Sequence, residues 1–271
     1  MALTWQHMQL PLSYQSSSSS SWNKPVEKWP TAICSVDAGQ PGRRVTDTFL
    51  GTSHEYTRIF DYGEEYIHAW ANVFRKLSSS PIIRVGGASQ DKMKQVPGPR
   101  VWKALNALQQ RVNARFIFGL PLWQKNAVQL SKQIMALAQK NLSPASVIGF
   151  ELGNEGEWKG GFDAFAKYFH SVAQQLAPCG SGKRILSGPG WGNVNTQPHN
   201  WMARIMWTGK ECGYMWEVNV HYYPYIDNTT VTQEQLLAQS LQDIGLEKYR
   251  EYQRLADQGK MRLRISETNS L

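Results

Sequence analysis

The sequence has few cysteines, no long apolar run and no dense run of basic residues. The three cysteines, Cys34, Cys179 and Cys212, show no metal-ligand spacing, and their odd number argues against a complete disulfide framework. No apolar run approaches the length of a membrane span, and the N-terminus lacks the basic start and apolar core of a signal peptide. These absences argue against a disulfide-stapled scaffold, a metal centre and a membrane protein.

The charge balance is basic, with a formal net charge of +8, which suits an anionic partner. However, Lys and Arg never occur in a cluster longer than two residues, so we expect no nucleic-acid patch. A basic solvated surface is the simpler interpretation. The sequence also has eleven Trp and eleven Tyr residues. Core packing explains most of these aromatic rings, and some could serve as platforms on which sugar rings stack.

The length of 271 residues suits one large core, and single-domain barrels of about 250 residues are common. Residues 1–45 are predicted to be an irregular or poorly ordered segment, because the serine run at 16–21 offers nothing that packs. The folded domain is predicted to comprise residues 46–271.

Apolar runs and helical apolar spacing alternate along this domain. The runs predict strands at 48–53, 81–85, 115–120, 147–152, 184–188, 217–222 and 261–266. The helical spacing predicts helices at 66–77, 101–112, 127–139, 162–176, 201–208 and 233–256. Strand–helix alternation implies a parallel sheet.

Two parallel architectures fit this alternation, a closed barrel and a doubly wound open sheet. No glycine fingerprint separates the first strand from the first helix, and polar residues end nearly every strand. We therefore expect an α/β fold of the (β/α)8 TIM type with about seven strand–helix units. The first and last strands should flank a gap and be less buried than the strands between them.

The stretch VIGFELGNEGE at 147–157 is central to the functional prediction. An apolar strand stops at Gly153, and the polar pair Asn154 and Glu155 follows at its C-terminal end. In a barrel, polar residues at these strand ends form the active site. Glu267 occupies the equivalent position after the last predicted strand. Paired carboxylates can supply the acid and the nucleophile or base that glycoside cleavage requires.

Further polar residues accompany the two glutamates. Asn154 is placed to hydrogen-bond a sugar hydroxyl, and His221 or Tyr223, at the end of the sixth strand, could orient Glu267. A core histidine or a stacked tyrosine is nearly as good an explanation. Glu151 and Glu157 are interpreted as supporting or surface groups.

Several of these segments together resemble glycoside hydrolase family 79, the β-glucuronidase and heparanase-like group of retaining (β/α)8 enzymes. The matching pieces are RVGGASQD at 84–91, FELGNE at 150–155, HYY at 221–223 and ISETNS at 265–270. The resemblance implies that Glu155 is the acid/base and Glu267 the nucleophile. It also implies a uronic-acid-containing carbohydrate substrate, no cofactor and a secreted or extracellular location.

The predicted substrate-binding residues are Asn154, His221, Tyr223, Gly87, Ser89, Asp91 and, in the glycine-rich loop after the fifth strand, Trp191. The sequence departs from the family pattern at Ala88 and Gly156, and the family's eighth strand and C-terminal β-sandwich are expected to be absent. Two alternatives to a β-glucuronidase therefore remain. One is a related β-glycosidase for neutral sugars such as xylosides or glucosides, and the other is an inactive fragment or carbohydrate-binding remnant.

Overall fold

A computed structural model describes residues 46–62, 66–156, 161–192, 199–223 and 245–268. The chain divides into two compact units, Met1–Arg44 and Val45–Leu271. The first unit lies outside the described residues, so the predicted irregular N-terminal segment stays a prediction. Within the described residues, no helix is long and apolar enough to cross a membrane.

The second unit is built on one parallel sheet whose strands follow each other in chain order. The strands are β1 (Gly51–Glu55), β2 (Ile82–Gly86), β3 (Arg115–Leu120), β4 (Val147–Leu152), β5 (Leu186–Trp191), β6 (Met215–Tyr222) and β7 (Arg262–Thr268). The α-helices are α1 (Ile67–Leu77), α2 (Ala88–Asp91), α3 (Pro99–Val112), α4 (Ala127–Asn141), α5 (Phe162–Leu176), α6 (His199–Cys212) and α8 (Gly245–Gly259). Two 3-10 helices, Tyr56–Tyr62 and Pro144–Ser146, lie after β1 and before β4.

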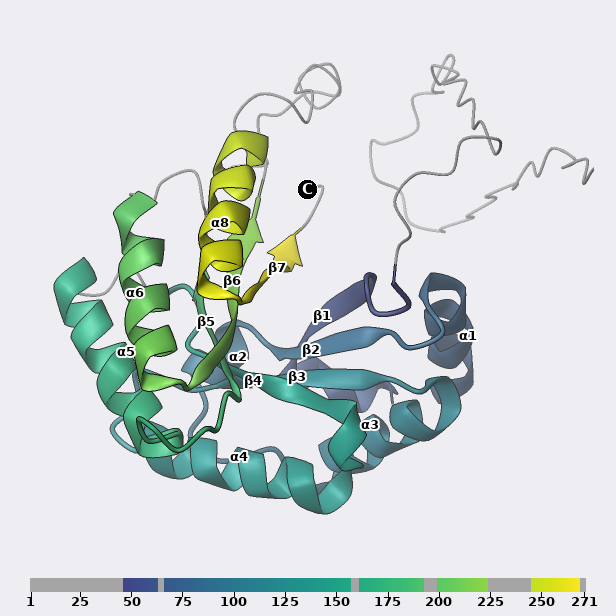
Figure 1. The fold of residues 1–271 in the computed structure, drawn as a ribbon. Helices are drawn as coiled ribbons and strands as arrows, with labels where there is room; N and C mark the ends of the chain where they lie inside the picture. Colours follow the sequence, from purple (N-terminus) through teal and green to yellow (C-terminus); the bar gives the residue numbers. More distant parts are fainter. Residues whose placement is uncertain (1–45, 63–65, 157–160, 193–198, 224–244, 269–271) are drawn as a thin grey trace, which may run out of the picture. The chain divides into compact units, whose positions relative to one another are not determined.

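The sheet curls on itself and its helices cover the outer face, as Figure 1 shows. Its end strands, β1 and β7, approach each other without a described hydrogen-bonded ladder between them. The fold is an incomplete (β/α)8 TIM-type barrel, as predicted from the alternation. All residues of β2 are buried, whereas those of β1 and β7 are largely half-buried or exposed, which confirms the expected difference between central and end strands.

The helices form where apolar residues recur with helical spacing. In α5, the residues that pack inward are those that the spacing selects: Phe162, Phe165, Ala166, Phe169, Val172, Ala173 and Leu176. They contribute to one continuous core between the sheet and its helical cover.

Several predicted boundaries need correction, among them those of the first strand, the fifth strand and the last helix. The first strand begins at Gly51 and not at Thr48, because the chain turns at residues 46–49, where the Phe49 N–H donates to the Thr46 carbonyl. The fifth strand continues to Trp191, so this residue is not in a loop. The last predicted helix, at 233–256, is described only as α8 from Gly245, and its earlier part lies outside the described residues.

The fifth strand is rich in glycine and proline, yet it is fully buried. A Cβ at Gly188 would lie 2.9 Å from the Phe169 ring, so glycine lets α5 pack directly on this strand. Pro189 and Trp191 pair with Asn219 and Val220 of β6, with a register shift between them. Close packing thus overrides a composition that is typical of a loop.

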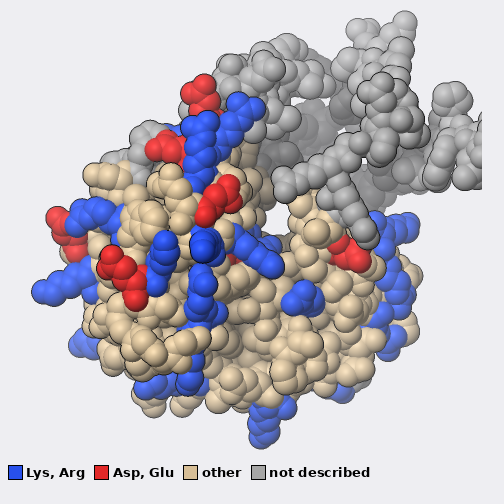
Figure 2. All heavy atoms as spheres, in the orientation of Figure 1, with Lys and Arg blue, Asp and Glu red and all other residues tan. Residues whose placement is uncertain are grey.

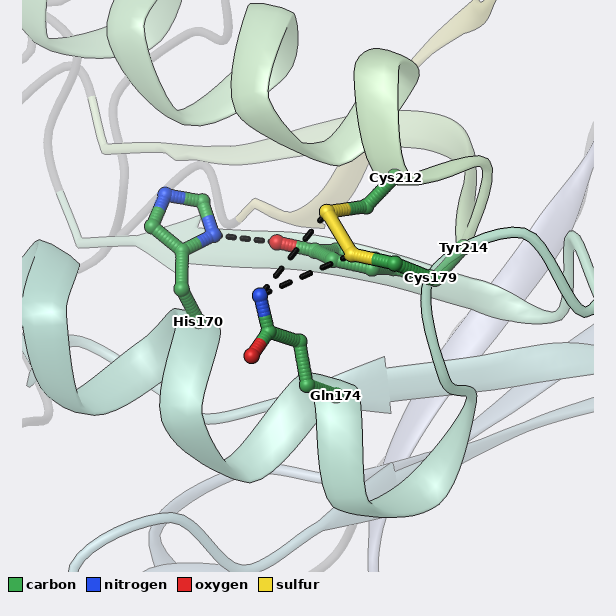
Figure 3. The surroundings of a disulfide bond; sticks show 5 residues. All are labelled: His170, Gln174, Cys179, Cys212 and Tyr214. Atoms are coloured by element: carbon green, nitrogen blue, oxygen red, sulfur yellow. Dashed lines mark hydrogen bonds between the residues drawn. A yellow bond between two sulfur atoms is a disulfide. The ribbon is translucent and has the colours of Figure 1, made fainter.

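A disulfide bond joins Cys179 and Cys212, which follow α5 and end α6. Figure 3 shows Gln174 of α5 donating a hydrogen bond to both sulfur atoms, at 3.6 and 3.8 Å. The cysteine count did not predict this pair. The bond ties together the ends of two neighbouring helices of the barrel.

Candidate active site

Glu155 and Glu267 lie at the same rim of the barrel, because they follow or end parallel strands at their C-terminal ends. His221, near the end of β6, lies between them. Its Nδ1 is 2.9 Å from Glu155 Oε1, and its Nε2 is 3.7 Å from Glu267 Oε2. One buried imidazole ring therefore separates the two carboxylates, and we predict that they lie about 5–5.5 Å apart, as double displacement requires.

The backbone at Glu155 has an unusual conformation. Its φ of 45° lies in the left-handed region, which residues other than glycine seldom adopt. The Glu155 N–H donates to the Gly190 carbonyl at 2.8 Å, which anchors this turn to the end of β5. The side chain passes Gly192, where a Cβ would lie 3.0 Å from the carboxyl carbon. In this conformation the Glu155 side chain is 37% exposed.

Glu267 reaches the same mouth because of an irregularity in β7. The register between β6 and β7 shifts at this point, since Val220 pairs with Ile265 and His221 pairs with Glu267. Ser266 is the extra residue of a β-bulge, and bulges re-aim the side chains beside them. Ser266 Oγ is buried against Asn219. Without the extra residue, simple alternation would turn Glu267 away from the face that Ser266 occupies.

The Glu267 carboxylate is held by two donors. Arg84 Nη1 lies 2.8 Å from its Oε2, and the Tyr223 hydroxyl donates a hydrogen bond to its Oε1. These contacts come from the second and sixth strand units. The predicted role of Tyr223 in orienting Glu267 therefore has a direct structural basis.

Arg84 is the principal residue that the sequence analysis did not select as a site residue. It is 3% exposed and projects from β2 into the barrel, where its guanidinium contacts Glu151, Ser53, Asn154 and Glu267. A buried charge requires such partners. The signal in the sequence is an arginine within the otherwise apolar run PIIRVGG.

Glu151 and Asn219 complete this interior network. Both are fully buried, and the Asn219 amide donates to the Glu151 carboxylate. Glu151 is therefore an internal support and not a surface group. Asn219 Oδ1 accepts from the Gly190 N–H at 3.1 Å, so the network also reaches the backbone that anchors Glu155. Glu157 lies outside the described residues.

The surroundings change the protonation equilibria of the site. The hydrogen bond from His221 lowers the pKa of the Glu155 carboxyl; partial burial opposes this effect, and the charges of His221 and Arg84 add to it. Burial raises the pKa of the Tyr223 phenol, and its bond to Glu267 acts in the same direction. Burial opposes the charge on Arg84, but its carboxylate partners outweigh that effect and raise the pKa of the guanidinium.

Three predicted substrate-binding residues follow β2: Gly87 lies directly after the strand, and Ser89 and Asp91 belong to α2. Gly87 has a φ of 88°, and a Cβ there would lie 2.5 Å from the Glu55 carboxylate. That carboxylate accepts the N–H groups of Ala88 and Ser89. Ser89 also lines a hollow of about 650 Å³ that Glu55 shares, and the Asp91 carbonyl accepts from Gln124. Their predicted contacts with substrate stay predictions.

Two other predicted residues have different surroundings. Asn154 is 4% exposed, and its Oδ1 accepts a hydrogen bond from Arg84 at 2.9 Å. Trp191 is fully buried and packs against Phe165 and Trp201. The Trp191 ring therefore belongs to the core and is not available as a platform for a sugar ring.

The site is thus a pair of glutamates on either side of a histidine, supported by a buried charge network in a TIM-type barrel. In the described part of the chain, no group of three histidine, cysteine or carboxylate side chains is arranged to hold a metal ion. Among the charged side chains on the face that Figure 2 shows, basic ones outnumber acidic ones.

Comparison with known protein families finds no match, and no curated protein matches the sequence. Among solved structures, the chain is similar to an exo-beta-1,4-mannosidase, Op5Man5, from Opitutaceae bacterium strain TAV5. The TM-score is 0.39 and the identity 11%, over 65% of this chain and 38% of the mannosidase chain. A likeness at this level carries no information on substrate, and the resemblance to family 79 stays a prediction.

Proposed function

We propose that this chain is the catalytic barrel of a retaining glycoside hydrolase, with Glu155 as acid/base and Glu267 as nucleophile. The observation that carries the proposal is the placement of both carboxylates at one rim, on the two nitrogen sides of a single imidazole. Two flanking carboxylates are what double displacement at an anomeric carbon requires.

The different partners of the two glutamates suit different roles. Arg84 and Tyr223 fix the Glu267 carboxylate from two sides, and a nucleophile must be held in its productive geometry. Glu155 has one described side-chain hydrogen bond, to His221, which suits a group that exchanges protons with substrate and water.

The proposed reaction has two steps. Glu155 donates a proton to the leaving glycosidic oxygen while a Glu267 oxygen attacks the anomeric carbon, which forms a glycosyl ester. Glu155 then takes a proton from water, the water oxygen attacks the anomeric carbon, and Glu267 leaves as a carboxylate. His221 and Tyr223 act as positioning residues, and Asn154 is proposed to contact a sugar hydroxyl.

The proposed substrate is a β-glucuronoside, on the basis of the sequence resemblance and the net charge of +8. One observation favours the alternative of a neutral β-glycoside. Within the described part of the site, the Arg84 guanidinium is committed to two carboxylates and an amide, so it does not present a cation to a uronate.

Azide rescue tests the assigned roles directly. With an activated aryl glycoside, Glu155→Ala should accept azide at the glycosyl-enzyme and release a β-glycosyl azide. Glu267→Ala should instead give the α-azide, because azide then attacks the substrate from the face that Glu267 occupied. Glu151→Gln, which alters a supporting carboxylate, serves as the control and should give no azide product. The same anomer from both variants would refute the assignment.

Aryl β-glucuronide, β-glucoside and β-xyloside with one leaving group test the substrate. Preference for the glucuronide, with a KM that rises with salt, is expected if positive charge steers an anionic sugar. Preference for a neutral sugar would support the alternative. Because no described hydrogen-bonded ladder joins β1 to β7, binding without turnover on any of the three would support the carbohydrate-binding alternative.

A further inference from the structure

A groove of about 730 Å³ lies on the outer side of the barrel between α4 and α5. The α4 residues that line the groove recur with helical spacing and include Gln129, Lys132 and Gln133. Tyr168 and Gln175, two turns apart on α5, line the opposite wall. Glu155 and Glu267 are not among the lining residues, so the groove is separate from the candidate active site.

The charges in the groove are of one sign. Among the described lining residues, the charged side chains are Lys125 and Lys132, and both are exposed. Neither forms an ion pair with a described carboxylate. The lining thus presents two cations and no carboxylate, which favours a negative ligand.

Five of the eleven uncharged lining residues are amides. Gln129, Gln133 and Gln175 each present a donor and an acceptor on one side chain, and the hydroxyl of Ser171 does the same. The hydroxyl groups of a sugar require both at short intervals. Tyr168 adds a half-buried ring, which is stacked on Trp123 with centroids 5.3 Å apart and is therefore held in place.

The groove opens at the catalytic end of the barrel. Gln124 and Lys125 lie in the loop after β3, and the Gln124 amide donates to the backbone carbonyls of Gln90 and Asp91 in α2. Trp123, on which Tyr168 stacks, also packs against the turn of the acid/base, because a Cβ at Gly156 would lie 2.8 Å from its indole nitrogen. An extended ligand could thus pass from the mouth onto this wall.

We infer that the α4–α5 groove is a binding site for an acidic oligosaccharide, with the lysines contacting uronate carboxylates and the amides contacting hydroxyl groups. The groove binds a chain of sugars and not a lone anion, because its polar groups are spread along both helices and do not converge on one point. A nucleic acid would require a denser set of cations and several stacking rings.

Saturation-transfer NMR with an α-linked hexagalacturonate tests this site. The α-linkage makes the ligand a non-substrate for the proposed β-glycosidase, so the result is independent of the catalytic proposal. We expect saturation transfer to the hexagalacturonate and little to a neutral cellohexaose. Gln133→Glu, which places a carboxylate of the same size in the groove, should weaken binding about tenfold.

The matched control is Gln139→Glu, which makes the same change at an exposed position of α4 outside the groove. A double variant, Lys125→Gln with Lys132→Gln, should also weaken binding about tenfold, whereas Lys140→Gln with Lys167→Gln should not. Equal affinity in the groove and control variants would overturn the proposal. So would equal binding of cellohexaose, or of a polyphosphate with the same charge, because either would show that the groove does not recognise an acidic sugar.

Discussion

At the scale of single residues, the hydrogen bond between His221 and Glu155 controls when the proposed acid carries its proton. The bond lowers the pKa of Glu155, and a general acid loses activity as the pH rises through its pKa. The alkaline limb of the activity profile should therefore lie at low pH, and weakening the bond should move that limb upward.

His221→Leu removes the donor, and we expect the alkaline limb of kcat/KM to shift to higher pH. His221→Asn is the matched control, because an amide N–H can still donate toward Glu155 and should retain most of the lowering. Profiles of kcat/KM measured with a glycoside whose leaving group requires protonation compare the two variants. An alkaline limb that moves down in His221→Leu would contradict this role of His221.

The left-handed backbone of Glu155 makes a separate prediction about stability. A side chain at a φ of 45° costs about 1 kcal/mol, which glycine avoids. Glu155→Gly and Glu155→Ala both remove the carboxylate and its hydrogen bond to His221. We therefore expect the glycine variant to be about 1 kcal/mol more stable than the alanine variant in chemical denaturation.

Asn113, the C-cap of α3, provides the matched comparison. It also has a positive φ, of 52°, but it is not part of the candidate site. The Gly and Ala variants of Asn113 should differ in the same sense. If Glu155→Gly is no more stable than Glu155→Ala while the Asn113 pair differs, the strain at Glu155 is absent.

At the scale of helices and strands, the sequence predicts regular elements well and irregular ones poorly. The inward face of α5 follows from spacing alone, since local periodicity determines it. The fifth strand was cut short because its glycines and proline imitate a loop, and the bulge at Ser266 leaves no local signature. Both depend on packing against elements that are distant in the sequence.

The candidate site shows the same division. Glu155 and Glu267 could be selected because each ends a predicted strand. The role of Arg84 could not, because its carboxylate partners Glu151 and Glu267 lie 67 and 183 residues away in the sequence. Only the closed curvature of the sheet brings them together. A charged residue in an apolar strand was nevertheless visible, and barrel interiors normally hold branched apolar side chains.

The bond between Cys179 and Cys212 makes a prediction about α5 and α6. The two cysteines are 33 residues apart, and a loop of this length stabilises a fold by roughly 3–4 kcal/mol. Reduction, or the double change Cys179→Ser with Cys212→Ser, should lower the free energy of unfolding by about this amount. Calorimetry with and without reductant measures it, and Cys34→Ser is the control. Equal melting temperatures in both conditions would argue against the bond.

A disulfide also suits the proposed extracellular location.

At the scale of the whole barrel, the gap between β1 and β7 leaves strand edges without a described partner. Apolar side chains are exposed beside it, with Phe49 68%, Leu50 46% and Ile265 48% exposed. Parallel barrels normally close and so have no free edge. Edges that combine unpaired backbone groups with apolar side chains are sites of self-association.

We therefore expect residues 1–271, purified alone, to self-associate, and we expect turnover to be lost with association because Glu267 lies on the end strand that borders the open edge. Ile265→Lys places a charge at the edge and should raise the protein concentration at which light scattering first detects oligomers. Gln139→Lys adds the same charge to an exposed position of α4 and should not. The contacts of Glu267 come from Arg84 and Tyr223, so Ile265→Lys leaves them in place. A chain that stays monomeric at high concentration and turns over substrate at a rate typical of glycosidases would show that the open seam is stable without further polypeptide.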